Sequence, residues 1–189
     1  MKYARLDLGT IEAVFNKLGG VEGAEAFLRD DLVLKRPELL KRIATAQVAG
    51  AKKFVVKDEL KSSNVGFTGG NFDSLFLNLV EENVEGAKLA VHQLEKAALD
   101  APILAELGDR AATKLCWLFD LLKKQGKGEK GVLLVNGYAN VVYVRDANGT
   151  LWAVSADWSS HYGDWGVCAF SVGRPSTWSE GRQILSRDS

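Results

Sequence analysis

The residues best suited to chemistry lie in one short segment near the C-terminal end of the chain, residues 157–165. The segment holds two carboxylates and an imidazole, those of Asp157, Asp164 and His161. A carboxylate beside an imidazole can act as a general acid–base pair or supply part of a metal site. Asp, Ser, His and Gly are also common turn residues. These three residues are therefore the candidate catalytic group of an enzyme, and an ordinary turn is the competing interpretation.

The sequence predicts neither a metal site nor a cofactor. A mononuclear zinc site needs three or four ligands, and the only other histidine, His92, lies in a distant predicted strand. Residues 126–131 match GxGxxG by letters, but in the predicted order of helix, loop and strand the backbone dipoles would point away from a pyrophosphate. We interpret them as a solvated turn. His161 and Cys168 could form a base–nucleophile couple, but the strand pattern around Cys168 favours a buried thiol.

Aromatic side chains are concentrated in the last third of the chain, where they could fill a core or form a binding face. All five tryptophans follow residue 116. Between residues 132 and 178 only Arg145 and Arg174 are basic, against three aspartates, so phosphates would find little to bind. A binding face here would suit a protein partner or a neutral small ligand. The candidate binding residues are Tyr138, Tyr143, Trp158, His161, Tyr162 and Trp165.

The composition is that of an ordinary globular chain. Of its 189 residues 47% are hydrophobic, and 24 basic residues balance 24 acidic ones, so the formal net charge is zero. No global field draws the chain toward nucleic acid or an anionic membrane. We see no secretory leader and no stretch of transmembrane length, and Cys116 and Cys168 show no metal-binding or disulfide spacing. We therefore expect a cytoplasmic protein with reduced thiols and no membrane partner.

The spacing of apolar residues predicts an α+β fold. Helical periodicity occurs in residues 11–18, 22–29, 37–50, 72–80, 101–107 and 109–125. Strands are predicted at residues 32–34, 54–56, 87–94, 132–135, 139–145, 151–156, 165–172 and 183–185. The predicted architecture has N-terminal helices with short strands, a central apolar helix, and a C-terminal antiparallel β-meander of four to five strands packed on that helix. We expect no parallel sheet, because the final strands are joined by short turns that cannot make a crossover.

Residues 61–70 are rich in Ser, Asn and Gly and are the one credible linker. They divide the chain into a small helical N-terminal module, residues 1–60, and an α+β body, residues 71–189.

Two stretches resemble a group of uncharacterised bacterial proteins. The first is IEAVFNKLGG at residues 11–20, followed by Glu22-Gly23, which together match that group's N-terminal NKLGG-x-EG motif. The second covers most of the chain from about residue 72 onward. It includes His92, Leu94-Glu95-Lys96, Asp100-Ala101-Pro102-Ile103, Asn136-Gly137-Tyr138-Ala139-Asn140, Tyr143-Val144-Arg145-Asp146 and Ser186-Arg187. The resemblance implies a short N-terminal element followed by an α+β body with an aromatic-rich β C-terminus. It implies no activity, cofactor or catalytic residue.

Three functions remain open from the sequence. The first is a small non-enzymatic binding or interaction protein that uses the aromatic sheet face and the 157–165 loop, with a homodimer left open. The second is a hydrolase-like enzyme with Asp157, His161 and Asp164 in a cleft beside Tyr138 and Tyr143. The third is a weak nucleic-acid binder that uses a patch of basic residues. That patch consists of Lys35, Arg36, Lys41, Arg42, Lys52 and Lys53.

The exposure of two tryptophans and the geometry of the acid–base pair separate these functions. A sheet face that binds a partner needs Trp158 and Trp165 exposed, whereas an enzyme needs Asp157 and His161 to converge on a pocket.

Overall fold

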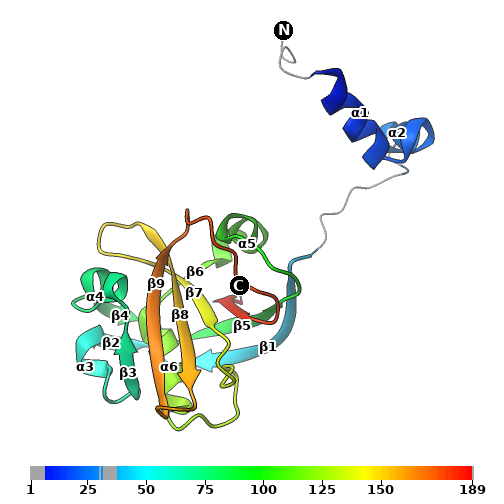
Figure 1. The fold of residues 1–189 in the computed structure, drawn as a ribbon. Helices are drawn as coiled ribbons and strands as arrows, with labels where there is room; N and C mark the ends of the chain where they lie inside the picture. The colour runs from blue at the N-terminus through cyan, green and yellow to red at the C-terminus, as the bar shows by residue number, and fades with distance from the viewer. Residues whose placement is uncertain (1–6, 30, 32–37, 189) are drawn as a thin grey trace. The chain divides into compact units, whose positions relative to one another are not determined.

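The computed structural model describes residues 7–29, 31 and 38–188. The chain forms two compact units, Met1–Pro37 and Glu38–Ser189, and each is described here by itself (Figure 1). The division falls between residues 37 and 38 rather than in the predicted linker at 61–70. The reason is that strand β1 (Leu40–Val48), which was placed in the N-terminal module, pairs with strand β5 (Ala87–Leu94) of the larger unit.

The described part of the first unit is a pair of short helices, α1 (Leu8–Lys17) and α2 (Gly20–Leu28), as the periodicity predicts. The N-cap of α1 is Asp7, whose carboxylate accepts a 2.7 Å hydrogen bond from the backbone N–H of Thr10. The helices approach closely at Gly23, where an added Cβ would lie 1.5 Å from the carbonyl oxygen of Leu18. The predicted strand at 32–34 lies outside the described residues.

The second unit is a mixed α+β body built on a large sheet. Its other strands are β2 (Ala51–Val55), β3 (Val65–Thr68), β4 (Val80–Val84), β6 (Ala112–Thr113), β7 (Asn140–Arg145), β8 (Leu151–Ser159), β9 (Asp164–Ser171) and β10 (Gln183–Arg187). Its helices are α3 (Val56–Glu59), α4 (Gly70–Phe76), α5 (Asp100–Leu107), the 3₁₀ turn η1 (Gly108–Arg110) and α6 (Leu115–Lys124).

Within the described residues the main sheet has eight strands, in the order β1-β5-β10-β7-β8-β9-β3, with β6 beside β7. The predicted meander is present only as β7-β8-β9, whose two hairpins are antiparallel. The sheet is mostly antiparallel, in line with the expectation of no parallel sheet, but it is mixed, because β10 pairs parallel with β7, β6 with β7, and β3 with β9. The short-turn argument holds for β7, β8 and β9, which short hairpins join, whereas the strands of each parallel pair are connected by a long stretch of chain, such as the one that contains α6 between β6 and β7.

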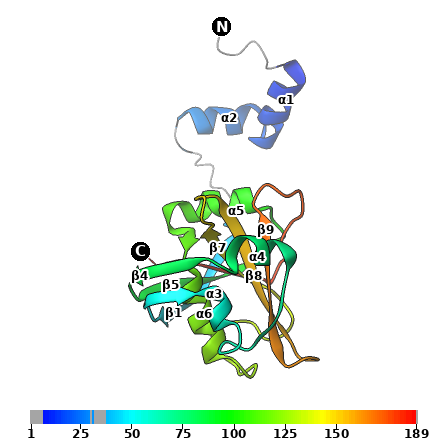
Figure 2. The same cartoon turned by 90° about the vertical axis from the view of Figure 1, so that its left-hand side faces the viewer.

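A two-stranded ribbon leaves this sheet at one edge. β1 pairs with β5, while their continuations β2 and β4 pair with each other as a separate small sheet, and Figure 2 shows β1, β4 and β5 together. Gly50 and Gly86 lie where the ribbon passes between the sheets. A Cβ at Gly50 would lie 2.1 Å from the carbonyl oxygen of Val84, so the close backbone approach requires glycine.

Two hydrophobic clusters cover the two faces of the main sheet. Helix α6 supplies Leu115, Leu118 and Leu122 to the larger cluster, which also receives Trp158 and Trp165. Helix α5 supplies Ile103 and Leu107 to the other, and Figure 2 shows the two helices on opposite sides of the strands. The prediction of a central apolar helix is therefore confirmed, although α6 begins at Leu115 and not at residue 109.

Several element predictions fail where long-range pairing decides the structure. Residues 40–48 of the predicted helix 37–50 form β1, because they pair with β5 over almost their whole length. The predicted linker contains β3, which pairs with β9. The predicted helix 72–80 is divided into α4 and the start of β4, and residues 132–135 form no strand.

In the part of the chain that the structure describes, no helix is long and apolar enough to span a membrane.

Candidate functional site

The segment predicted to carry chemistry is the hairpin between β8 and β9. Asp157 is half-buried opposite Gly166, and Asp164 is paired with Ser159 across the strands. His161 is exposed at the tip, where its ring lies edge-on to Tyr162 with the centroids 4.6 Å apart. No hydrogen bond joins the three candidate catalytic side chains within the described residues. Burial raises the pKa of Asp157, and Arg182 opposes that rise, but this carboxylate has no imidazole beside it.

Three of the six candidate binding residues lie in the core and cannot form a contact surface. Tyr143, Trp158 and Trp165 are 0%, 8% and 0% exposed. The two tryptophans are cross-strand partners and pack edge-to-face at 5.3 Å. Their shared face is covered by α6 and by the loop after it, where the Trp165 indole N–H donates to the carbonyl of Gln125. Of the predicted set, Tyr138, His161 and Tyr162 remain exposed.

Residues 126–131 form a turn, and the glycine at its centre, Gly128, packs against the core. Gly128 has φ +69°, and an added Cβ would lie 2.4 Å from the indole of Trp158. Cys168 lies in β9, as its strand pattern indicated, but it is half-buried rather than fully buried, and burial raises the pKa of its thiol. The thiol is packed beside Gly69 rather than beside His161.

The predicted basic patch is only partly described. Lys35 and Arg36 lie outside the described residues. Lys41 and Arg42 lie on β1, and Lys52 and Lys53 lie on β2, all of them exposed. Arg42 forms an ion pair with Asp188.

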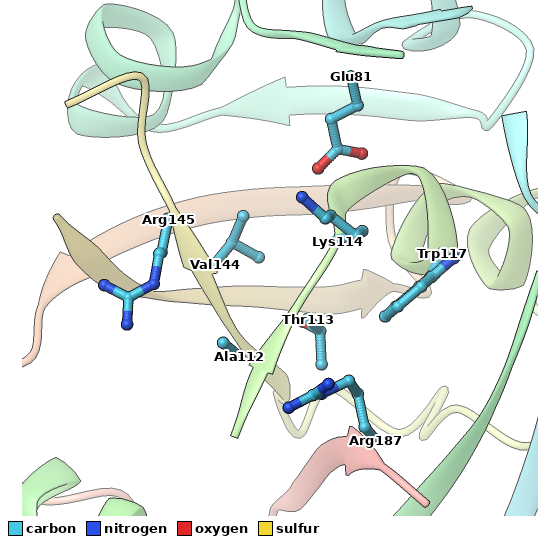
Figure 3. A pocket seen from close by; sticks show the side chains of 8 residues that line it. All are labelled: Glu81, Ala112, Thr113, Lys114, Trp117, Val144, Arg145 and Arg187. Atoms are coloured by element: carbon cyan, nitrogen blue, oxygen red, sulfur yellow. The ribbon is translucent and has the colours of Figure 1, made fainter. Parts of the chain in front are cut away.

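A cavity of about 320 Å³ opens between β6, β7, β10 and the first turn of α6, and we call it the α6 cavity. It is lined by Glu81, Ala112, Thr113, Lys114, Trp117, Val144, Arg145 and Arg187. Figure 3 shows Glu81 and Lys114 at one end, Arg187 at the other, and Arg145 and Trp117 on the two sides. Three cationic side chains and one carboxylate thus surround a space large enough for a small molecule.

Glu81 lines the cavity and also caps the start of α6. Its two carboxylate oxygens accept hydrogen bonds from the backbone N–H groups of Leu115 and Cys116, at 3.1 and 2.9 Å. These N–H groups are at the start of α6, where the helix dipole favours a negative charge. Both carboxylate oxygens therefore already accept hydrogen bonds from the helix terminus, and the single negative charge of Glu81 faces three cations around the cavity.

The three cations of the α6 cavity have spare donors. Nη2 of Arg187 donates to the carbonyl of Asp109, and its buried Nε has no partner among the described residues. Nη1 of Arg145 donates to the carbonyl of Gly149 at 2.7 Å. Within the described ranges none of Lys114, Arg145 and Arg187 forms an ion pair.

No sequence pattern indicates this cavity as a site. Glu81 falls just beyond a predicted helix, and Lys114 falls inside another. The predicted elements therefore give no reason to expect the two side chains to lie close together. Arg145 and Arg187 are among the residues of the family resemblance, which assigned them no role. Their approach depends on the parallel pairing of β6 and β10 with β7, which no local pattern predicts.

A second cavity, of about 380 Å³, lies beside His92 and is lined by Lys41, Arg42, Glu106 and Arg110 among others. Nε2 of His92 is 3.2 Å from the hydroxyl of Ser186, and Nδ1 is buried without a partner in the described chain. Burial, and then the charges of Arg110 and Arg42, lower the pKa of this imidazole. Ser186 is fully buried, so this pair is not accessible for nucleophilic chemistry.

The helical pair of the first unit carries the largest group of exposed apolar side chains. We call this group the α1–α2 face, and it consists of Leu8, Ile11, Val14, Phe15, Val21, Phe27 and Leu28. Leu8 and Leu28 are 82% and 81% exposed, and Ala24 is the one buried residue of the two helices. In the larger unit, by contrast, the exposed large apolar residues come singly from different elements, for example Phe67 and Tyr138.

Among the described residues no group of three or more His, Cys, Asp or Glu side chains could hold a metal ion. Comparison with known proteins gives no match to a family model, a curated protein or a solved structure.

Proposed function

We propose that the chain is a non-enzymatic interaction protein whose contact surface is the α1–α2 face. The observation that carries this proposal is the exposure of seven large apolar side chains on two helices of ten and nine residues. Helices this short are marginal in water, and most of their stability comes from burying an apolar face. A partner that covers these side chains supplies that burial.

The chemistry of the partner follows from the charges around the face. The described residues of this unit carry five carboxylates, those of Asp7, Glu12, Glu22, Glu25 and Asp31, against only Lys17 and Arg29. The partner that fits is an amphipathic helix of another protein, with apolar residues at helical spacing and lysines or arginines at its rim.

The surface predicted from sequence, the aromatic sheet face, is replaced in this proposal because Tyr143, Trp158 and Trp165 fill the core. The separation of Asp157 from His161 gives no support to the hydrolase-like alternative. For the nucleic-acid alternative, the charge of the described basic residues on β1 and β2 is the one supporting feature.

The test is fluorescence anisotropy with the full chain and two labelled model peptides of one apolar pattern, one with lysines and one with glutamates at the polar positions. The lysine peptide should bind and the glutamate peptide should not, and added salt should weaken binding. Ile11→Ser and Phe27→Ser should each weaken binding of the lysine peptide by at least about tenfold, since a buried apolar side chain contributes about 1.5–3 kcal/mol. Phe67→Ser, which removes an exposed apolar side chain of the larger unit, is the matched control and should leave binding unchanged.

Equal binding of the two peptides, or loss of binding in Phe67→Ser as large as in Ile11→Ser, would refute the proposal. Light scattering over a range of concentrations gives the remaining outcome. A dimer that is lost in Ile11→Ser would show that a second copy of the chain covers the face, and it would overturn the proposal of a different partner.

A further inference from the structure

We propose that the α6 cavity binds a small oxyanion, a phosphate or carboxylate group, carried on a flat apolar body. This site lies in the larger unit and is independent of the interaction proposed for the α1–α2 face.

The first support is the charge around the cavity. Lys114, Arg145 and Arg187 come from three segments far apart in sequence, and the fold brings them around one space of about 320 Å³. Like charges placed together repel one another, and an anion between them removes that repulsion. The one carboxylate of the cavity, Glu81, has its two oxygens engaged by the start of α6.

The second support is the state of the hydrogen-bond donors. Arg187 uses Nη2 on the carbonyl of Asp109, while its Nε has no acceptor in the described chain. A buried donor without an acceptor is costly, so an oxyanion that accepts from Nε removes that cost, in exchange for the bond from Nη2 to Asp109 when the guanidinium turns. Guanidinium groups bind phosphate and carboxylate through two parallel N–H donors, which gives an oxyanion preference over a halide.

The third support is the apolar wall, which selects for more than a bare ion. Trp117 and Val144 line the cavity between the charged ends (Figure 3). The Trp117 indole is held in place, because its N–H donates at 3.0 Å to the carbonyl of Glu85. A flat apolar group against this indole would bury area that inorganic phosphate does not have.

The test is calorimetric titration of the full chain with phenyl phosphate, benzoate, inorganic phosphate and phenylammonium. Phenyl phosphate and benzoate should bind saturably, inorganic phosphate should bind more weakly, and phenylammonium should not bind. The stronger of the two aromatic anions identifies which oxyanion the site prefers. In the ¹H–¹⁵N spectrum the Trp117 indole signal, assigned through Trp117→Phe, should shift with the bound fraction.

Two variants and a matched control decide the role of the cations. Lys114→Gln and Arg187→Gln should each lower the affinity for phenyl phosphate by roughly three- to tenfold. This is the range expected when one charge-assisted hydrogen bond to a partly exposed cation is lost. Lys61→Gln removes one exposed lysine that does not line the cavity and should bind as the unmodified chain does. If Arg187→Gln fails to fold, Lys114→Gln alone carries the test, because the Lys114 side chain has no bond to the rest of the described protein.

The proposal is overturned by any of three results. These are no saturable binding of either aromatic anion at about 10 mM, the weakest affinity worth assigning, equal binding of phenylammonium, or equal affinities in Lys114→Gln and Lys61→Gln. Inorganic phosphate that binds as tightly as phenyl phosphate would overturn the role of the apolar wall.

Discussion

The hydroxyl of Tyr143 donates a 2.8 Å hydrogen bond to Oδ1 of Asp100, and both side chains are fully buried. Asp100 is the first residue of α5, and Tyr143 lies in β7, so this bond joins the helix to the sheet beneath it. The same oxygen accepts a 2.7 Å bond from the indole N–H of Trp178. Arg174, stacked over the rings of Phe170 and Trp178, places its charge 3.9 Å from Oδ2.

Tyr143→Phe should destabilise the protein by about 1.5–3 kcal/mol, because a buried carboxylate loses one of its two donors while the packing volume is kept. Urea denaturation measures the change in the free energy of unfolding. Tyr138→Phe is the control, since the Tyr138 ring is half-exposed and its hydroxyl has no hydrogen-bond partner in the described chain. A Tyr143→Phe protein within about 0.5 kcal/mol of the unmodified chain would show that this bond contributes nothing net.

Glu81→Gln should destabilise the protein by about 1–2 kcal/mol. The amide keeps one acceptor for the start of α6, but it loses the second acceptor and the negative charge that the helix dipole favours. The neighbouring Glu82 is exposed, so Glu82→Gln removes the same charge without touching α6. Thermal or urea unfolding of the two variants compares them directly, and equal stabilities would refute a capping role for Glu81.

Local signals predicted those parts of the fold that depend on neighbours in sequence. Asn-Gly between two apolar runs is a strong local signal for a hairpin; Asn148-Gly149 joins β7 to β8, and Gly149 has φ +81°. The stripes of α1, α2 and α6 were predicted in the same way. Residues 40–48 were misassigned because Leu40, Ile43 and Val48 fit a helical stripe, and only the pairing with β5 selects a strand.

The candidate site depended on contacts that no local pattern contains. Alternation placed Trp165 in a strand but Trp158 in the connection before it, so it could not say that the two share a sheet face, or whether that face meets solvent or α6. The packing of Gly128 against Trp158 and the bond from Trp165 to Gln125 decide that it meets α6 and its loop. The cations of the α6 cavity lie at residues 114, 145 and 187, and only the parallel pairing around β7 brings them together.

The stability of the protein should fall as the pH drops from about 7 to 5, and His92 should be the cause. Burial, with Arg110 and Arg42, lowers the pKa of His92 in the folded state below its ordinary value of 6.5, while Glu106 and Asp188 partly oppose this. Above pH 6.5 the imidazole is neutral in both states and stability does not depend on it. As the pH falls through 6.5 the unfolded chain binds a proton that the folded chain does not, so unfolding is favoured, by at most about 1.4 kcal/mol per pH unit.

Urea denaturation at a series of pH values checks this expectation. His92→Gln should flatten the dependence between pH 7 and 5, whatever it does to stability at neutral pH. His161→Gln, which changes the exposed imidazole at the hairpin tip, is the control and should keep the slope of the unmodified chain. A slope that survives in His92→Gln would assign the effect to another group.

Cys116 should be alkylated much more slowly in the folded protein than a cysteine thiol with the ordinary pKa. Burial, followed by the adjacent charge of Glu81, raises the pKa of Cys116 to about 12 from an ordinary value of 9.0. The thiolate is the reacting species, and at pH 8 its fraction falls by roughly a thousandfold between these two pKa values.

Iodoacetamide labelling of the Cys168→Ser variant, followed by mass spectrometry, isolates Cys116. We expect labelling at least about a thousandfold slower in the native protein than in urea, and Glu81→Gln should label faster than Glu82→Gln, because only the first removes the charge beside the thiol. Native labelling of Cys116 as fast as in urea would mean that the start of α6 opens readily, and that the contact between Glu81 and α6 does not hold it closed.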